Sequence, residues 1–184
     1  MSAITAAALL GRRRRFVSQG VSARIDRVEV QGCAFAVKRF EARTRPAWSR
    51  EVASHLCCAQ PEVIGIIAYG LDDRGRSWLA TSWREARQAR YWIKNGHPEL
   101  QATAKAWLDL FQTRLSLFGY RWYDATTRNL LLSAEQLTRP RPAFQVVDYT
   151  LVPFRNQLAF AECLVELEKM QPAEWRQSSA GCLQ

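Results

Sequence analysis

The stretch FGYRWYDATTRNLLL, residues 118–132, decides how the rest of this chain is interpreted. An aromatic-rich segment leads to one acid, Asp124, and a polar run then ends in Asn129 just before a short apolar strand. Asp and Asn are common turn residues, so each of them alone predicts no more than a turn. An acid and an amide five residues apart become informative only if other parts of the chain supply matching groups.

The composition allows a substantial core and favours anionic partners. The chain has 184 residues, 48% of them hydrophobic, which predicts one compact unit or two small lobes that share a cleft. Its net charge of +9 and isoelectric point near 9.8 indicate attraction to nucleic acid, anionic lipid or phosphate-bearing small molecules. The aromatic residues follow core periodicity instead of interleaving with basic ones, so we rank nucleic acid last.

Cysteines and the N-terminal segment bear on the cellular compartment. The five cysteines form no CxxC pair and lie at no zinc-ligand spacing, which favours reduced intracellular thiols. In MSAITAAALLGRRRR the apolar residues precede the basic ones, the reverse of a secretory signal. No run approaches the roughly 18 apolar residues of a membrane span. We therefore expect a cytoplasmic protein whose residues 1–15 form a basic, flexible arm ending in Arg12–Arg15.

Residues 16–84 predict a five-stranded antiparallel sheet. Residues 16–40 are rich in β-branched and aromatic side chains and suggest three strands, with Gln31-Gly32 as the second hairpin turn. Two more strands are predicted over residues 62–70 and 76–83, joined by a turn-forming segment. The first 84 residues thus resemble a strand-rich lobe.

One helix is predicted within this strand lobe, over residues 44–56, with Pro46 near its start. Its Glu51 lies beside the apolar stripe. In the preceding strand, alternation places Ala36 and Lys38 on one face of the sheet, opposite Phe35. We expect Lys38 and Glu51 to face each other.

Residues 85–184 predict a second, mostly helical lobe. An amphipathic helix is indicated over residues 100–119, followed by a hairpin of the short apolar runs 129–133 and 144–148. A last amphipathic helix precedes a tail of about a dozen residues with no clear pattern. The predicted fold class is therefore α+β and bilobal, with a short C-terminal lobe.

Five polar residues follow one another on these predicted elements: Lys38, Glu51, Asp124, Asn129 and Asp148. Phosphoryl transfer from a nucleotide requires such a set, in which a lysine held by a glutamate neutralises phosphate oxygens. One aspartate orients the attacking hydroxyl, and an asparagine with a second aspartate holds magnesium. Each residue alone is more often a solvated charge, a turn residue or a strand-end cap; their order favours the functional interpretation.

The same segments resemble the protein-kinase-like fold. AFAVKRF (34–40) resembles its lysine strand, WSREVASHL (48–56) the partner helix, YDATTRNLLL (123–132) the catalytic loop D-x-x-x-x-N, and VVDYT (146–150) the metal-binding D-F-G segment. Within that fold the pattern is most similar to the bacterial lipopolysaccharide-core sugar kinases. The resemblance implies ATP and Mg²⁺ as cofactors, a sugar hydroxyl on an anionic glycolipid as acceptor, and work at the inner face of a bacterial membrane.

The resemblance also assigns roles to individual residues. Asp124, Lys38 and Glu51 would be catalytic, Asn129 and Asp148 would bind the metal, and the nucleotide would be bordered by the residues Lys38, Gly20, Ala36 and Trp83. Several positions depart from the family: Trp122-Tyr123 precede Asp124, Thr126 replaces a lysine, Tyr149-Thr150 replace Phe-Gly, and only Gly20 remains of the Gly-rich loop. These departures leave open a minimal, secreted protein serine/threonine kinase, or a pseudokinase that binds without turnover.

Overall fold

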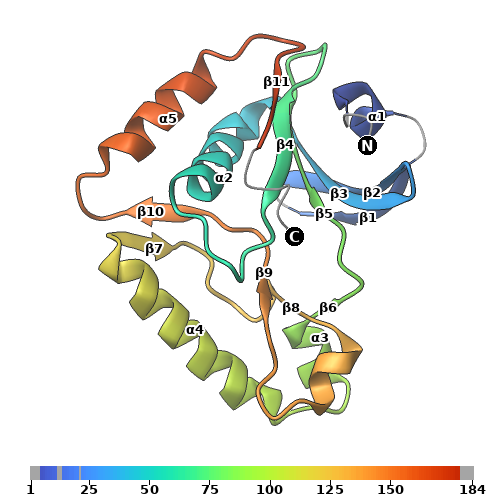
Figure 1. The fold of residues 1–184 in the computed structure, drawn as a ribbon, viewed down its shortest axis with the longest axis vertical. Coiled ribbons are helices and arrows are strands. Elements are labelled where there is room, and N and C mark those ends of the chain that lie inside the picture. The colour runs from blue at the N-terminus through green and yellow to red at the C-terminus, as the bar shows by residue number, and fades with distance from the viewer. Residues whose placement is uncertain (1–4, 12–13, 21, 179–184) are drawn as a thin grey trace.

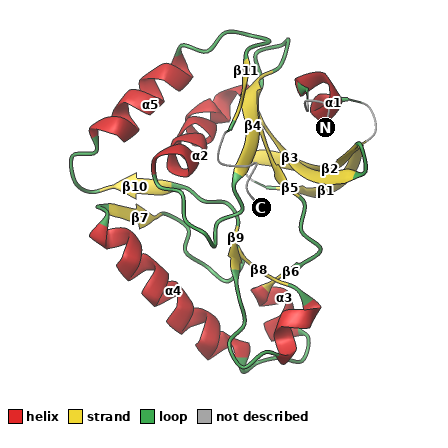
Figure 2. Ribbon diagram, in the orientation of Figure 1, coloured by secondary structure: helices red, strands yellow, loops and turns green. Residues whose placement is uncertain are grey.

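A six-stranded antiparallel sheet is the largest element of the fold (Figures 1 and 2). The computed structural model describes residues 5–11, 14–20 and 22–178. In spatial order the strands are β1 (Arg14–Gln19), β2 (Ala23–Val30), β3 (Cys33–Phe40), β5 (Ser77–Ser82), β4 (Ile66–Leu71) and β11 (Trp175–Gln177). The α+β class is confirmed, and the predicted count of five strands is wrong by one.

The first hairpins follow the predicted alternation. Gln31 and Gly32 both have positive φ, at 52° and 78°, which is the backbone of a two-residue hairpin turn, and Val30 pairs with Cys33 around it. Phe35 is buried on one face of β3, and the side chain of Lys38 lies on the other. The turn and the alternation predicted from the sequence are therefore confirmed.

The sixth strand comes from the C-terminal end of the described residues. β11 pairs with β4 at the sheet edge, with Trp175 opposite Gly70. A Cβ on Gly70 would lie 2.4 Å from Glu174 O and 2.6 Å from the Trp175 Cα, so only glycine permits this approach. The expected patternless tail is thus partly a strand, and residues 175–177 belong to the large sheet.

A short helix, α1 (Ala6–Leu10), packs on one face of the sheet. Leu9 is fully buried there, in a cluster that includes Val28 and Phe35. Arg14 and Arg15 belong to β1 and pair with β2. The prediction of a flexible arm over residues 1–15 is therefore wrong for these described parts, and its Arg12 and Arg13 lie outside the described residues.

The opposite face of the sheet is covered by α2 (Arg45–Cys57), which follows the 3₁₀ turn η1 (Ala42–Thr44). Pro46 lies in the first turn of α2, as predicted, because its missing N–H costs nothing there. Trp48 is fully buried, and its indole donates to the carbonyl of Trp78 in β5 at 2.9 Å. Helix α5 (Leu158–Glu168) packs against α2, and the two run side by side in Figure 1.

The remaining elements surround the segments that were predicted as the hairpin. They are the helices α3 (Ala89–Lys94) and α4 (Leu100–Leu117), the 3₁₀ turn η2 (Ala134–Thr138), the three-stranded sheet β6 (Arg87–Gln88), β8 (Leu130–Leu132) and β9 (Gln145–Val146), and the pair β7 (Tyr120–Trp122) and β10 (Leu151–Pro153). The predicted hairpin is confirmed by the antiparallel pairing of β8 with β9.

The elements of the preceding paragraph lie below the large sheet in Figure 1 and are called the lower elements from here on. One hydrophobic core connects them with the large sheet. It contains Trp48 and Leu79 from the α2 face of the sheet together with Phe111 and Leu130 from below. Among the described helices, none has the length and apolarity that crossing a bilayer requires.

Candidate functional site

Lys38 lies at the centre of a buried charge cluster. Its Nζ donates to Glu51 Oε2 at 2.6 Å and to Asp148 Oδ1. The Lys38 side chain is 12% exposed and that of Glu51 is 6% exposed, whereas that of Asp148 is 51% exposed. The structure therefore brings together three of the five residues that the sequence singled out.

Three separate elements supply these groups. β3 directs Lys38 towards α2 because its pairing with Ile25 and Leu79 fixes the register of the strand. Glu51 is in the buried face of α2, two turns from its start. Asp148 follows β9 and approaches from the elements below the sheet. A buried ion pair of this kind costs desolvation energy that the attraction of its partners must offset.

Burial and neighbouring charges have opposite effects on the pKa values of Lys38 and Glu51. Burial alone would lower the pKa of Lys38, but the carboxylates of Glu51 and Asp148 outweigh it and the pKa is raised. Lys38 therefore carries its charge throughout the physiological range. Burial raises the pKa of Glu51 in spite of the neighbouring ammonium. Removal of Lys38 would therefore leave the buried Glu51 carboxyl without its nearest counter-charge, which is costly.

Asp148 is held in a conformation that few residues adopt. Its φ is 58°, in the left-handed region that Asp tolerates better than most side chains. The indole of Trp122 donates to its carbonyl at 3.1 Å, and the next residue, Tyr149, is fully buried with its hydroxyl donating to the Cys58 carbonyl at 2.9 Å. These contacts direct the Asp148 carboxylate away from the core and towards Lys38.

Asp124 and Asn129 form a closed loop of hydrogen bonds. The buried Asn129 side chain donates through Nδ2 to both the carbonyl and Oδ2 of Asp124, at 2.9 and 3.0 Å. Within the loop, the amide of Thr126 donates to the Asp124 carbonyl. The loop is tied to the Asp148 segment because Val147 N donates to Asn129 O at 2.9 Å. Asp124 itself is exposed, so an approaching molecule can reach its carboxylate.

A cluster of aromatic rings supports both acidic segments. Tyr149 packs edge-on against His55 of α2, with ring centroids 5.4 Å apart, and contacts Trp122 at 6.4 Å and Phe111 of α4 at 6.3 Å. The sequence interpretation treated Trp122 and Tyr149 only as departures from a family pattern. Their position next to Asp124 and Asp148 was the available signal that they hold these residues in place.

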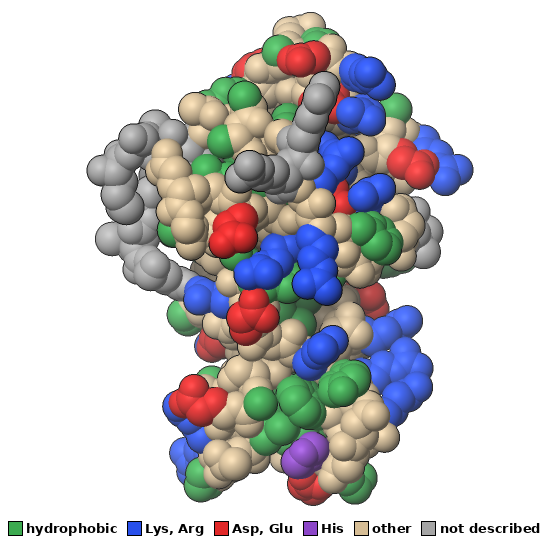
Figure 3. Space-filling view, turned by 90° about the vertical axis from the view of Figure 1, so that its right-hand side faces the viewer, with side chains coloured by type: hydrophobic (Ala, Val, Ile, Leu, Met, Phe, Trp, Pro, Cys, Tyr) green, Lys and Arg blue, Asp and Glu red, His purple; other side chains and the backbone are tan. Residues whose placement is uncertain are grey.

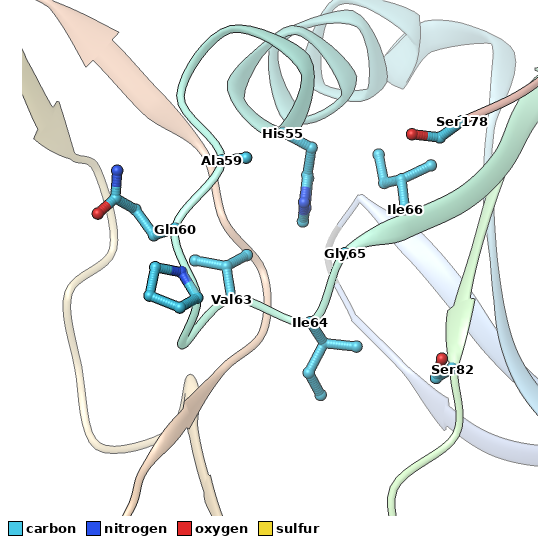
Figure 4. Close-up of a pocket in the computed structure, with 10 residues that line it drawn as sticks. His55, Ala59, Gln60, Val63, Ile64, Gly65, Ile66, Ser82 and Ser178 are labelled. Carbon is cyan, nitrogen blue, oxygen red and sulfur yellow. The ribbon is translucent and has the colours of Figure 1, made fainter. Parts of the chain in front are cut away.

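His55 borders a separate pocket of about 210 Å³ at the end of α2. Figure 4 shows its ring pointing into this space, with Gly65 and the first residue of β4, Ile66, beside it and Ser178 across from it. Burial, and secondarily the charge of Lys38, lower the pKa of His55 to about 3. His55 is therefore a buried residue that is neutral at physiological pH.

The other predicted site residues are less closely placed. Ala36 shares the Lys38 face of β3 and pairs with Thr81. Gly20 lies exposed between β1 and β2, and an added Cβ would meet only Ala23 O at 3.4 Å, so the backbone there does not require glycine. Trp83 lines a hollow of about 530 Å³ that neither Lys38 nor Ala36 borders. The structure therefore does not bring Trp83 into one hollow with Lys38.

Asn129 and Asp148 each offer an oxygen atom of the kind that a small hard cation takes. Because Asn129 uses its amide nitrogen on Asp124, its amide oxygen is left for another partner, and Asp148 presents a half-exposed carboxylate. Mg²⁺ takes oxygen ligands and is commonly held by one or two protein groups together with phosphates and water. Among the described residues no group of three His, Cys, Asp or Glu could hold a metal ion by itself.

No protein-family model matches the chain, and no curated protein matches it at the significance required of a relative.

Proposed function

We propose that this chain is an ATP- and magnesium-dependent phosphotransferase with a bilobal, protein-kinase-like architecture. The observation that carries the proposal is the contact of the buried Lys38 ammonium with both Glu51 and Asp148. A lysine gripped by a helix glutamate, opposite a metal-binding aspartate, is the arrangement that positions nucleotide phosphates.

The two lobes of this proposal correspond to the two groups of elements. The six-stranded sheet with α2 carries Lys38 and Glu51, whereas the lower elements carry Asp124, Asn129 and Asp148. A nucleotide bound between the groups would be contacted by charged residues from both. Gly20 and Trp83 contribute little to this proposal. The backbone at Gly20 does not require glycine, and Trp83 borders a different hollow.

Each residue of the cluster has a defined task in the proposed transfer. Lys38 exchanges its contact with Asp148 for the phosphate oxygens, and Glu51 keeps the ammonium in place. Asp124 accepts the hydrogen bond of the acceptor hydroxyl, whose oxygen bonds to the terminal phosphorus while the bond to the bridging oxygen of ADP breaks. The hydroxyl proton passes to Asp124 or to solvent. Asn129 orients Asp124 through its amide.

Asn129 and Asp148 would hold magnesium. When bound, magnesium would neutralise part of the negative charge on the phosphates. The oxygen atoms that both residues leave available support this assignment.

The acceptor that we propose is a hydroxyl of a lipopolysaccharide-core sugar, with the protein acting at the inner face of the bacterial membrane. Only nine residues, 149–157, separate Asp148 from α5, and α5 packs against α2 instead of extending the lower elements. Little surface is left on which to lay out an extended peptide, whereas a sugar needs only a pocket. The excess of basic residues favours an anionic glycolipid.

The direct test is turnover of Mg-ATP by the purified chain with a panel of acceptors: core glycolipid, deacylated core sugar and a protein substrate. We expect transfer to the glycolipid, with Lys38→Ala and Asp124→Ala each lowering the rate about a hundredfold or more, since each removes a transition-state contact. Gln101→Ala, at an exposed position in the first turn of α4, is the control and should leave the rate unchanged.

The panel separates the alternatives. Transfer to protein serine or threonine without transfer to glycolipid would support a minimal protein kinase. Nucleotide binding without turnover would support a pseudokinase, the alternative favoured by the sequences WYD (122–124) and DYT (148–150). Absence of nucleotide binding would contradict the proposal altogether.

A further inference from the structure

A hollow lined by arginines lies on the face of the sheet opposite Lys38. Lys38 and Arg39 are consecutive in β3, so their side chains point to opposite faces. The hollow has a volume of about 260 Å³, and its lining includes four arginines: Arg14, Arg24, Arg39 and Arg76. Figure 3 views the molecule from the side on which α1 lies in Figure 1, and Lys and Arg side chains gather on this face.

The sheet register forces two of these arginines together. Arg24 of β2 and Arg39 of β3 are direct cross-strand partners, an arrangement in which like charges repel. Asp26 is fully buried between them, with Oδ1 2.8 Å from Arg24 Nε and Oδ2 3.4 Å from Arg39 Nε. One carboxylate therefore serves two guanidinium groups.

The other two arginines, Arg14 and Arg76, give the hollow an excess of positive charge. Arg76 pairs with Asp72 at 2.7 Å, and Glu41 at the rim pairs with Arg43. The Arg14 guanidinium makes no hydrogen bond or ion pair with any residue in the described ranges. Four guanidinium groups thus face two carboxylates, Asp26 and Asp72, which leaves two positive charges without a counter-ion in the hollow.

The repulsion among these arginines affects the pKa of Arg39. Burial lowers its pKa first, and the neighbouring charges of Arg14 and Arg76 lower it further, more than Asp26 and Asp72 compensate. Only 17% of its side chain is exposed, so water screens it poorly.

We propose that this hollow binds a phosphomonoester group, held by the free guanidinium nitrogens of Arg14 and Arg24 over the floor formed by Arg39. A phosphomonoester carries about −1.5 to −2 charges at pH 7, which matches the two uncompensated cations. Guanidinium groups also suit its geometry because they donate pairs of parallel hydrogen bonds to oxyanions. The site is independent of the proposed phosphotransferase centre, which lies on the other face of β3.

The test uses the full chain and inorganic phosphate, with chloride at matched ionic strength as reference. Phosphate should raise the melting temperature of the wild type and of Arg141→Gln, and should bind Arg14→Gln at least tenfold more weakly in a calorimetric titration. Without phosphate, Arg14→Gln should be as stable as the wild type or more stable, because the substitution removes repulsion. Equal phosphate binding by wild type and Arg14→Gln, or none by either, would overturn the proposal.

Two further measurements locate the site and identify the kind of molecule that carries the phosphomonoester group. Lys38→Ala should retain phosphate binding; its loss there would place the anion at the nucleotide cluster and reject the hollow. Soluble glucose 6-phosphate is then compared with phosphatidylcholine vesicles containing phosphatidic acid, a phosphomonoester, or phosphatidylserine, a diester. Binding to glucose 6-phosphate indicates a free metabolite, whereas binding only to phosphatidic acid vesicles indicates a lipid headgroup. Equal binding to both kinds of anionic vesicle would contradict phosphomonoester recognition.

Discussion

At the residue scale, the imidazole of His55 shows how strongly the core resists an added charge. Its pKa is about 3 in the folded chain and about 6.5 in an unfolded one, because burial and the nearby Lys38 both disfavour protonation. As the pH falls through 6.5, the unfolded state takes up a proton that the folded state does not accept until about pH 3. The folded state therefore loses stability across that window.

The substitution His55→Phe should remove this component of acid sensitivity while keeping a ring against Tyr149. Between pH 7 and pH 4.5 the wild type should lose about 2–3 kcal/mol of unfolding free energy to this residue, and the variant should lose correspondingly less. Urea unfolding at the two pH values measures the difference. The other histidine, His97, has 37% of its side chain exposed, so His97→Gln should behave as the wild type. An acid loss in His55→Phe equal to that of the wild type would contradict this account.

The two aspartates of the cluster should separate in their effects on nucleotide binding. Asp148 is assigned to the metal, so Asp148→Asn should abolish the part of nucleotide affinity that depends on magnesium. Asp124→Asn should leave that affinity within about twofold, because its carboxylate is assigned to the acceptor. Titration of nucleotide with and without magnesium measures both. Equal losses in the two variants would reject the division of roles.

Sequence order predicted the contact of Lys38 with Glu51, because strand alternation and helix periodicity both constrain direction. It did not predict the left-handed backbone of Asp148, since that conformation depends on the burial of Tyr149 and the hydrogen bond from Trp122. For a similar reason the sequence did not predict the surroundings of Trp83. Its indole donates to Glu85 and its ring lies under Arg27, local contacts that no pattern encodes.

At the element scale, the strands flanked by clear turn signals were predictable, whereas the shortest elements were not. Helix α1 has five residues, too few for a helical period to be recognised, and is stabilised by the docking of Leu9. Strand β11 has three residues and exists because β4 offers a free edge far away in the sequence. Such elements depend on tertiary contacts instead of on local propensity.

The substitution Gly70→Ala should detach β11 from the sheet. The new Cβ would meet the backbone of Glu174 and Trp175 at 2.4–2.6 Å, which cannot be relieved by a side-chain rotation. We expect a loss of about 1–3 kcal/mol in unfolding free energy and faster proteolysis after residue 170. Gly65→Ala is the matched control, because nothing lies within 4 Å of its added Cβ. Unchanged protection of this segment in Gly70→Ala would refute the pairing.

The docking of α1 can be measured in the same way. Leu9 is fully buried, so Leu9→Ala should destabilise the chain by about 2–5 kcal/mol in chemical unfolding. Leu110, which is 72% exposed on α4, provides the comparison, and Leu110→Ala should change stability by less than about 0.5 kcal/mol. If Leu9→Ala left the free energy of unfolding unchanged, residues 1–15 would again be interpreted as a free arm.

At the scale of the whole molecule, one core joins the large sheet to the lower elements. The amide of Leu151 donates to Ser54 Oγ of α2 at 2.8 Å, and Val63 forms a bridge with Val146 of β9. Unfolding should therefore be a single transition, with tryptophan fluorescence and far-ultraviolet circular dichroism giving the same midpoint in urea. Two separated midpoints would show instead that the groups of elements unfold independently.

The late position of β11 has a consequence for biosynthesis. Five strands of the large sheet are made within the first 82 residues, but the edge of β4 stays unpaired until residue 177 has been synthesised. An unpaired strand edge is a template for pairing with other chains. During translation this edge would therefore be open to other growing chains or to chaperones, and only completion of the last described strand would close it.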